Sequence, residues 1–138
     1  MLLSEPETNL KATMKANGLP LERPLRVGCV GGGQLGRMMA LEAPRIGISM
    51  FFLDPSGAKC PAAQVVPSDR ILEGSLKDPA AIHALVQECD VVTVEIEHVG
   101  VETLHQLEKE QGVNVQPSAR VLGIISDKYL QKVRYYTV

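Results

Sequence analysis

Apolar residues along this chain fall into two alternating patterns: compact runs of strand length, and stretches in which they recur every three or four positions. The compact runs predict β-strands, and the nearly continuous apolar run at residues 48–53 is typical of a strand that is covered on both faces of a sheet. The predicted strands span residues 25–30, 48–53, 70–72, 91–96 and 113–115.

Helical periodicity follows most of these runs. The predicted helices span residues 34–45, 79–89, 101–110 and 119–129. Asp78 followed by Pro79 is a typical helix start, because aspartate caps free N–H groups and proline fits the first helical position. Gly112 is a typical helix end, and Ser118 is a typical cap for the last helix.

The alternation of strands and helices predicts an α/β fold, because parallel strands need right-handed crossovers that place helices against the sheet. We expect a Rossmann-like, doubly wound, mainly parallel sheet of about five strands with helices on both faces, within residues 25–132. Residues 1–24 mix polar residues with several prolines and show no sustained periodicity, which predicts a flexible tail.

A glycine-rich turn follows the first predicted strand, with Gly31, Gly33 and Gly36 in the spacing G-x-G-x-x-G. In such turns the first glycine permits a tight bend and the second lets the backbone approach an anion. The third lets the helix pack closely on the strand. The following helix presents free N–H groups and the positive end of its dipole. The turn therefore predicts a phosphate-bearing ligand, without identifying it.

Acidic residues follow two other strands at the same predicted edge of the sheet. Asp54 lies 18 residues after Gly36, where an acidic residue binds the ribose of a dinucleotide, although Asp-Pro is also a common turn signal. Glu95 and Glu97 share a face if both lie in a strand, and such like charges need solvent, a cation or a polar ligand. On these residues alone, an NAD(P)-binding module of a dehydrogenase or sensor stays open.

The composition argues against several classes of binding partner. The net charge of −2 gives no electrostatic basis for binding nucleic acid or an anionic membrane, and no apolar run approaches the ~20 residues of a membrane span. The three cysteines are widely spaced and form no C-x-x-C pair, which fits buried free thiols in a reducing, cytoplasmic setting. Glu97 and His98 are adjacent, so in a strand they point to opposite faces, and no metal site is predicted.

Five blocks along the chain, taken together, resemble one family. They are GGGQLGRM at residues 31–38, LDP at 53–55, PAAQV at 61–65, CDVVTVEIEHV at 89–99 and DKYLQK at 127–132. In this order and spacing they resemble the N-terminal domain of the phosphoribosylaminoimidazole carboxylase family, in its fungal type. The resemblance is to the ATP-dependent part, 5-(carboxyamino)imidazole ribonucleotide synthetase, and it covers residues 26–132.

The resemblance implies a pre-ATP-grasp domain of the ATP-grasp superfamily and a role in de novo purine biosynthesis. In the implied reaction, ATP and bicarbonate give carboxyphosphate, whose carboxyl group passes to the amine of aminoimidazole ribonucleotide. The family uses ATP and Mg²⁺, and its full-length members are expected to be homodimers or larger. Residues 133–138 leave the family pattern and the sequence stops before an ATP-grasp domain. We therefore interpret it as a truncated fragment that is inactive alone and binds no cofactor tightly.

The family pattern also implies roles for five residues. Gln34 and Leu35 match the pair that lines the phosphoribosyl substrate, with the backbone of Gly33 beside them. Glu95 matches the first glutamate of the E-I-E motif, which also lies at the substrate. Lys128 matches the basic residue that contacts ATP. No catalytic residue is implied within this sequence.

Overall fold

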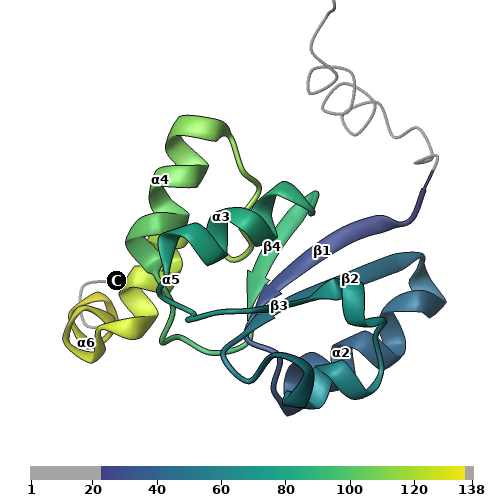
Figure 1. The fold of residues 1–138 in the computed structure, drawn as a ribbon. Coiled ribbons are helices and arrows are strands. Elements are labelled where there is room, and N and C mark those ends of the chain that lie inside the picture. Colours follow the sequence, from purple (N-terminus) through teal and green to yellow (C-terminus); the bar gives the residue numbers. More distant parts are fainter. Residues whose placement is uncertain (1–22, 136–138) are drawn as a thin grey trace, which may run out of the picture.

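The computed structural model describes residues 23–135 and places them in an α/β fold built on a four-stranded sheet (Figure 1). The strands are all parallel and lie in the order β3-β2-β1-β4. Their bounds are β1 Leu25–Val30, β2 Ile48–Asp54, β3 Ile71–Glu73 and β4 Val91–Val94. Most of the predicted tail lies outside the described residues, although Arg23 is described and its guanidinium bonds to Asp90.

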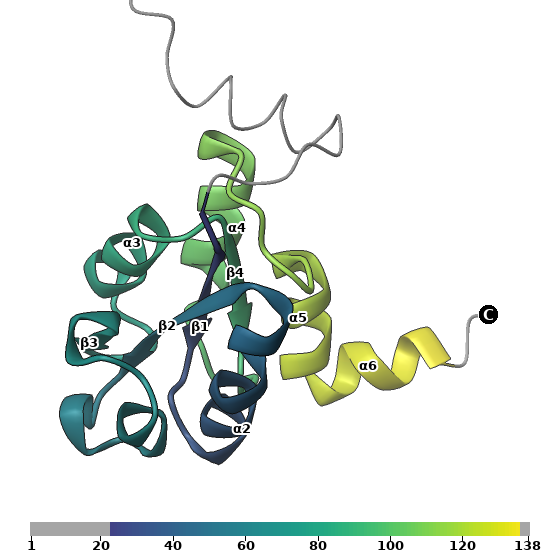
Figure 2. The same ribbon diagram turned by 90° about the vertical axis from the view of Figure 1, so that its right-hand side faces the viewer.

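Helices cover both faces of this sheet, as the sequence predicts, with α2 on one side and α3 and α4 on the other (Figures 1 and 2). The described helices are α2 Gln34–Glu42, α3 Pro79–Gln87, α4 Val101–Gln111, α5 Ala119–Ser126 and α6 Lys128–Tyr135. Short 3₁₀ turns occupy Ala43–Ile46, Gly57–Lys59, Pro61–Gln64 and Ser68–Arg70.

Alternate residues of β2 enter two different hydrophobic cores. Phe51 and Leu53 belong to the core that also takes in α3, α4 and α5. Met50 and Phe52 belong to the core that takes in α2 and the 3₁₀ turns beside it. Because both faces of β2 are buried from Met50 to Leu53, this stretch is a continuous apolar run rather than an alternating one.

The described sheet has four strands, whereas about five were predicted. Residues 113–115 join β4 only through a parallel bridge between Val115 and Val92. The N–H of Val92 donates to the carbonyl of Asn114 at 2.8 Å, and the N–H of Gln116 donates to the carbonyl of Val92 at 2.8 Å. The segment therefore contributes a single bridge and not a fifth strand of the sheet.

Four predicted elements end early, one of which is the helix predicted for residues 79–89, which ends at Gln87. The helix predicted for residues 34–45 is α2 followed by a 3₁₀ turn, because Pro44 has no N–H and its ring crowds the preceding helical turn. The last predicted helix is interrupted at Asp127, whose extended backbone separates α5 from α6. The strand predicted for residues 91–96 ends at Val94, opposite Val30, which is the last residue of β1.

The strand order creates a crevice between β1 and β4. From β1 the chain builds β2 and β3 on one side and then crosses back to place β4 on the other. In a parallel sheet this reversal leaves a crevice at the carboxyl ends of the two strands, where ligands bind. The glycine turn leaves β1 at this point and Glu95 directly follows β4, so both lie at the crevice.

Candidate functional site

The carboxylate of Glu95 joins the glycine turn to the end of β4. The N–H of Gly33 donates to Oε2 of Glu95 at 2.5 Å, and the N–H of Leu35 donates to Oε1 at 3.2 Å. Gly33 caps α2 and Leu35 lies in its first turn, where the helix dipole favours a negative charge. A carboxylate of the chain itself therefore holds the place that the glycine pattern assigns to a ligand anion.

A second carboxylate, that of Asp54 at the end of β2, fixes the same turn. Its Oδ2 accepts the N–H of Gly32 at 2.9 Å, and its Oδ1 accepts the N–H of Ser56 at 2.8 Å. Both oxygens are bonded to backbone, so Asp54 organises two consecutive turns. This engagement weighs against the ribose-binding role that its spacing from the glycines suggests.

Close approaches explain why the motif needs its glycines. Gly31 has a φ of 107°, a conformation that other residues rarely adopt. A Cβ at Gly36 would lie 2.9 Å from Cε1 of Phe52 in β2, which confirms the predicted close packing of helix on strand. A Cβ at Gly33 would collide with Oε1 of Glu95. The anion that Gly33 lets the backbone approach is therefore Glu95.

Two residues that pack against the glycine turn, Cys60 and Ala62, were not predicted from the sequence as part of the site. The N–H of Ala62 donates to the carbonyl of Gly32 at 2.9 Å, and both Ala62 and Cys60 are buried. A Cβ at Gly32 would lie 2.9 Å from Sγ of Cys60. The available signal was the extra glycine between the first two of the motif, because a glycine outside the required spacing needs a packing reason of its own.

Two cysteine thiols near the sheet stay protonated at neutral pH. Burial raises the pKa of Cys29 to about 12, and the negative charge of Glu95 adds to the effect. Burial likewise raises the pKa of Cys89 to about 12, with a further contribution from Asp90. Since the thiolate is the nucleophile, both residues act as apolar core groups, as the sequence predicts.

The remaining predicted site residues are exposed. Gln34 begins α2, and Leu35 is 57% exposed although its backbone N–H bonds to Glu95. Lys128 is exposed at the first residue of α6, which packs chiefly against α5. Both views place α6 away from α2 (Figures 1 and 2). The structure thus gathers the glycine turn and Glu95, while Lys128 lies apart from them.

Glu97 and His98 lie in solvent beyond β4. The condition for Glu95 and Glu97 to share a strand face is not met, because β4 ends at Val94 and both residues follow it. Oε1 of Glu97 lies 3.7 Å from Nε2 of His98, and both side chains are largely exposed. Within residues 23–135, no three His, Cys, Asp or Glu side chains are grouped to hold a metal ion. Over the same residues, no helix has the length and apolar character needed to cross a membrane.

Glu95 keeps acceptor capacity beyond its two backbone contacts. An ionised carboxylate offers about four lone-pair sites, and Gly33 and Leu35 use two of them. A ligand that donates hydrogen bonds, such as an amine or a hydroxyl, suits the others. A phosphate group at the same N–H groups would have to displace a bonded carboxylate. The geometry therefore favours a donor-bearing ligand group at Glu95.

Known proteins resemble this chain over most of its described residues. Residues 25–126 match the family model described as the ribonucleotide synthetase preATP-grasp domain. The chain is 45% identical over 106 residues to phosphoribosylaminoimidazole carboxylase of Ogataea methanolica, and 48% identical over 107 residues to the chloroplastic phosphoribosylaminoimidazole carboxylase of Vigna aconitifolia. These matches take in 77% and 78% of this chain but 19% and 18% of those proteins, so the chain spans about a fifth of their length.

A solved structure has the same fold over most of this chain. The N5-carboxyaminoimidazole synthase from Aspergillus clavatus, in complex with ADP and 5-aminoimidazole ribonucleotide, superposes with a TM-score of 0.75 at 38% sequence identity. The superposition covers 86% of this chain and 31% of that one.

Proposed function

We propose a function on one premise: the chain belongs to the ribonucleotide synthetase preATP-grasp domain family. It corresponds to the N-terminal, pre-ATP-grasp domain of phosphoribosylaminoimidazole carboxylases and N5-carboxyaminoimidazole ribonucleotide synthases. We infer that it forms the ribonucleotide half of the substrate site in an enzyme of purine biosynthesis that carboxylates aminoimidazole ribonucleotide. The observation that carries this inference is the carboxylate of Glu95, held at the crevice by two backbone N–H groups.

Glu95 is the group to which we assign the donors of the ribonucleotide. Its contacts with Gly33 and Leu35 fix its orientation before a ligand arrives, so binding costs little reorganisation. A ribose hydroxyl or the exocyclic amine would donate to its remaining lone pairs. The N–H of Gln34, in the first turn of α2, has no acceptor within the helix, and we assign it to a phosphate oxygen.

We assign the other steps of the proposed reaction to regions that the relatives contain outside the part that this chain matches. There, ATP and bicarbonate would give carboxyphosphate, and the carboxyl group would pass to the amine of the ribonucleotide. Lys128, an exposed cation at the start of α6, is our candidate for a contact to ATP. We expect the 138-residue chain to bind the ribonucleotide but not to carboxylate it.

The NAD(P)-binding alternative is disfavoured by the same contacts. A dinucleotide needs free N–H groups in the glycine turn for its pyrophosphate and a free acidic residue for its ribose. In this chain the N–H groups of Gly32, Gly33 and Leu35 are bonded to carboxylates. Asp54, the acidic candidate, is bonded to backbone through both oxygens.

Calorimetric titration of the chain with aminoimidazole ribonucleotide tests the proposal. We expect saturable binding that Glu95→Gln weakens at least about ten-fold, because a charge-assisted acceptor is lost. Glu97→Gln removes an exposed carboxylate two residues away and is the matched control, with unchanged affinity. Circular dichroism establishes that both variants are folded.

Two results would contradict this assignment. One is equal affinity of the Glu95→Gln variant and the wild type for the ribonucleotide. The other is saturable binding of NADH together with no response to the ribonucleotide. Separately, ATP hydrolysis that depends on aminoimidazole ribonucleotide in the purified chain would refute the expected lack of catalysis.

A further inference from the structure

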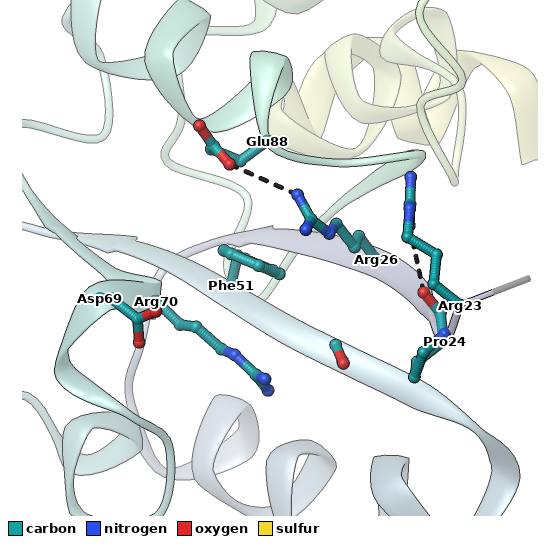
Figure 3. A pocket seen from close by; sticks show the side chains of 8 residues that line it. Arg23, Pro24, Arg26, Phe51, Asp69, Arg70 and Glu88 are labelled. Atoms are coloured by element: carbon teal, nitrogen blue, oxygen red, sulfur yellow. Dashed lines mark hydrogen bonds and ion pairs between the residues drawn. The ribbon is translucent and has the colours of Figure 1, made fainter.

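A cavity lies at the edge of the sheet opposite the crevice, near the amino ends of β1 and β2 (Figure 3). Its volume is about 310 Å³, at the small end of ligand pockets. Its lining comes from β1 and the two residues before it, from β2, from the turn before β3 and from Glu88, which directly follows α3. None of these residues takes part in the proposed ribonucleotide site.

Two guanidinium groups in this cavity flank one aromatic ring. The Cζ atom of Arg26 lies 5.5 Å from the centroid of the Phe51 ring, and that of Arg70 lies 5.6 Å from the same centroid. Both distances lie within the range of cation–π attraction. The ring thus lies between two like charges (Figure 3), and an anion in contact with both would offset their repulsion.

The nearby carboxylates do not engage all of the N–H donors of Arg26 and Arg70. The closest approach of Arg26 to Glu88 is 3.6 Å between Nη1 and Oε2, longer than an ordinary hydrogen bond. Within the described part of the chain, Arg70 makes no ion pair. Figure 3 shows the Asp69 carboxylate near the backbone end of Arg70, away from its guanidinium group. Donors therefore outnumber engaged acceptors around the Phe51 ring.

Two further polar residues line the cavity, Ser49 and Arg23. Ser49 pairs with Arg26 in the register of β1 and β2 and lines the cavity. Arg23 is engaged elsewhere, since its two terminal nitrogens bond to the two oxygens of Asp90 at 2.9 and 3.0 Å. The groups left to meet a ligand are the two guanidinium groups beside Phe51 and the hydroxyl of Ser49.

We propose that this cavity binds the phosphate group of a small phosphorylated ligand. Arg26 and Arg70 supply the charged contacts, because the planar fork of a guanidinium group matches the oxygens of a phosphate. Ser49 donates a third hydrogen bond. Phe51, which is 8% exposed, orients both guanidinium groups and excludes water beneath them.

An NMR titration of the ¹⁵N-labelled 138-residue chain with inorganic phosphate tests this site, with ionic strength held constant by sodium chloride. We expect saturating shifts of the backbone amides of Arg26, Ser49 and Arg70. Arg70→Gln should weaken the apparent affinity at least about ten-fold, because it removes a charge-assisted contact. Arg45→Gln, which alters an exposed arginine in the 3₁₀ turn after α2, is the matched control and should leave the affinity unchanged.

Two outcomes overturn the proposal: no saturable shift at the cavity, or saturating shifts confined to residues 32–35. The second outcome would place phosphate at the glycine turn and would leave the proposed ribonucleotide site standing. Loss of ribonucleotide binding in Glu95→Gln has no bearing on the cavity, so the two assignments fail separately. If Arg70→Gln does not fold, the test rests on the shifts of the wild-type chain and on Ser49→Ala. Ser49→Ala removes a single hydroxyl and should weaken phosphate binding several-fold.

Discussion

At the scale of single residues, the shape of the glycine turn depends on the contact between Gly33 and Glu95. Gly33 has a φ of −74°, which any residue can adopt, so its backbone conformation does not require glycine. The requirement comes from space, because a Cβ there would occupy the position of the Glu95 carboxylate. Gly31 is the contrasting case, since its φ of 107° itself favours glycine.

Gly33→Ala should therefore destabilise the fold by about 1–2 kcal/mol, because the added methyl group displaces the Glu95 carboxylate from its two N–H partners. Urea denaturation followed by circular dichroism measures the change in the free energy of unfolding. Gly123→Ala adds the same methyl group in α5, where the nearest atom would be 3.6 Å away, and is the matched control. We expect it to be neutral or stabilising by up to about 1 kcal/mol, because alanine is the better helix former.

A double-mutant cycle separates the clash from other effects of the Gly33 substitution. In a Glu95→Ala background the added methyl group has room, so Gly33→Ala should cost at least about 1 kcal/mol less than in the wild type. An equal cost in both backgrounds would show that the carboxylate is not what the glycine accommodates.

The chemistry of the turn could be predicted from the sequence only in part. The spacing of Gly31, Gly33 and Gly36 specifies a bend, a row of N–H groups and a close helix. It does not specify which anion fills the turn, because Glu95 lies 62 residues from Gly33 in sequence. That contact exists only because β4 is placed beside β1, which is a property of the assembled sheet.

At the scale of elements, the helix boundaries set by neighbouring residues were predicted well. Asp78 accepts the N–H of Ala80 at 3.1 Å, and Gly112 ends α4 in the left-handed conformation with a φ of 66°. The Ser118 hydroxyl accepts the N–H of Val121, the third residue of α5, at 3.4 Å. The break at Asp127 was not predicted, since no glycine or proline marks it and apolar periodicity continues across it.

Asp78→Ala should lower the free energy of unfolding by about 1 kcal/mol, because the start of α3 loses its side-chain cap. Asp78→Asn keeps an acceptor oxygen at the same position and should stay within a few tenths of a kcal/mol of the wild type. Chemical denaturation of the three proteins measures the difference. Equal losses in both variants would mean that the charge, rather than the hydrogen bond, stabilises the helix start.

At the scale of the whole molecule, burial of thiols in the cores makes stability depend on alkaline pH. The pKa values of Cys29 and Cys89 are raised from 9.0 to about 12 in the folded chain. Unfolded thiols lose their protons from pH 9.0 upward, whereas the folded ones keep theirs. The stabilisation is therefore complete below pH 9.0 and is lost as the pH rises toward 12.

We expect the free energy of unfolding to fall above pH 9.0 by up to about 1.4 kcal/mol per pH unit for each thiol. Urea titrations at neutral pH and above pH 9.0 measure the slope. The Cys29→Ala, Cys89→Ala double variant is the control, since it should be less stable at neutral pH but show a shallower decline. An unchanged slope in that variant would assign the pH dependence to other groups.

The place of β1 in the sheet has a consequence for synthesis of the chain on the ribosome. β1 is the first strand of the sheet to be made, yet it ends between β2 on one edge and β4 on the other. Until Val91–Val94 has emerged, one edge of the central strand keeps unpaired N–H and C=O groups, which are a template for pairing with other chains. A nascent chain that stalls before β4 is therefore the form most in need of a chaperone.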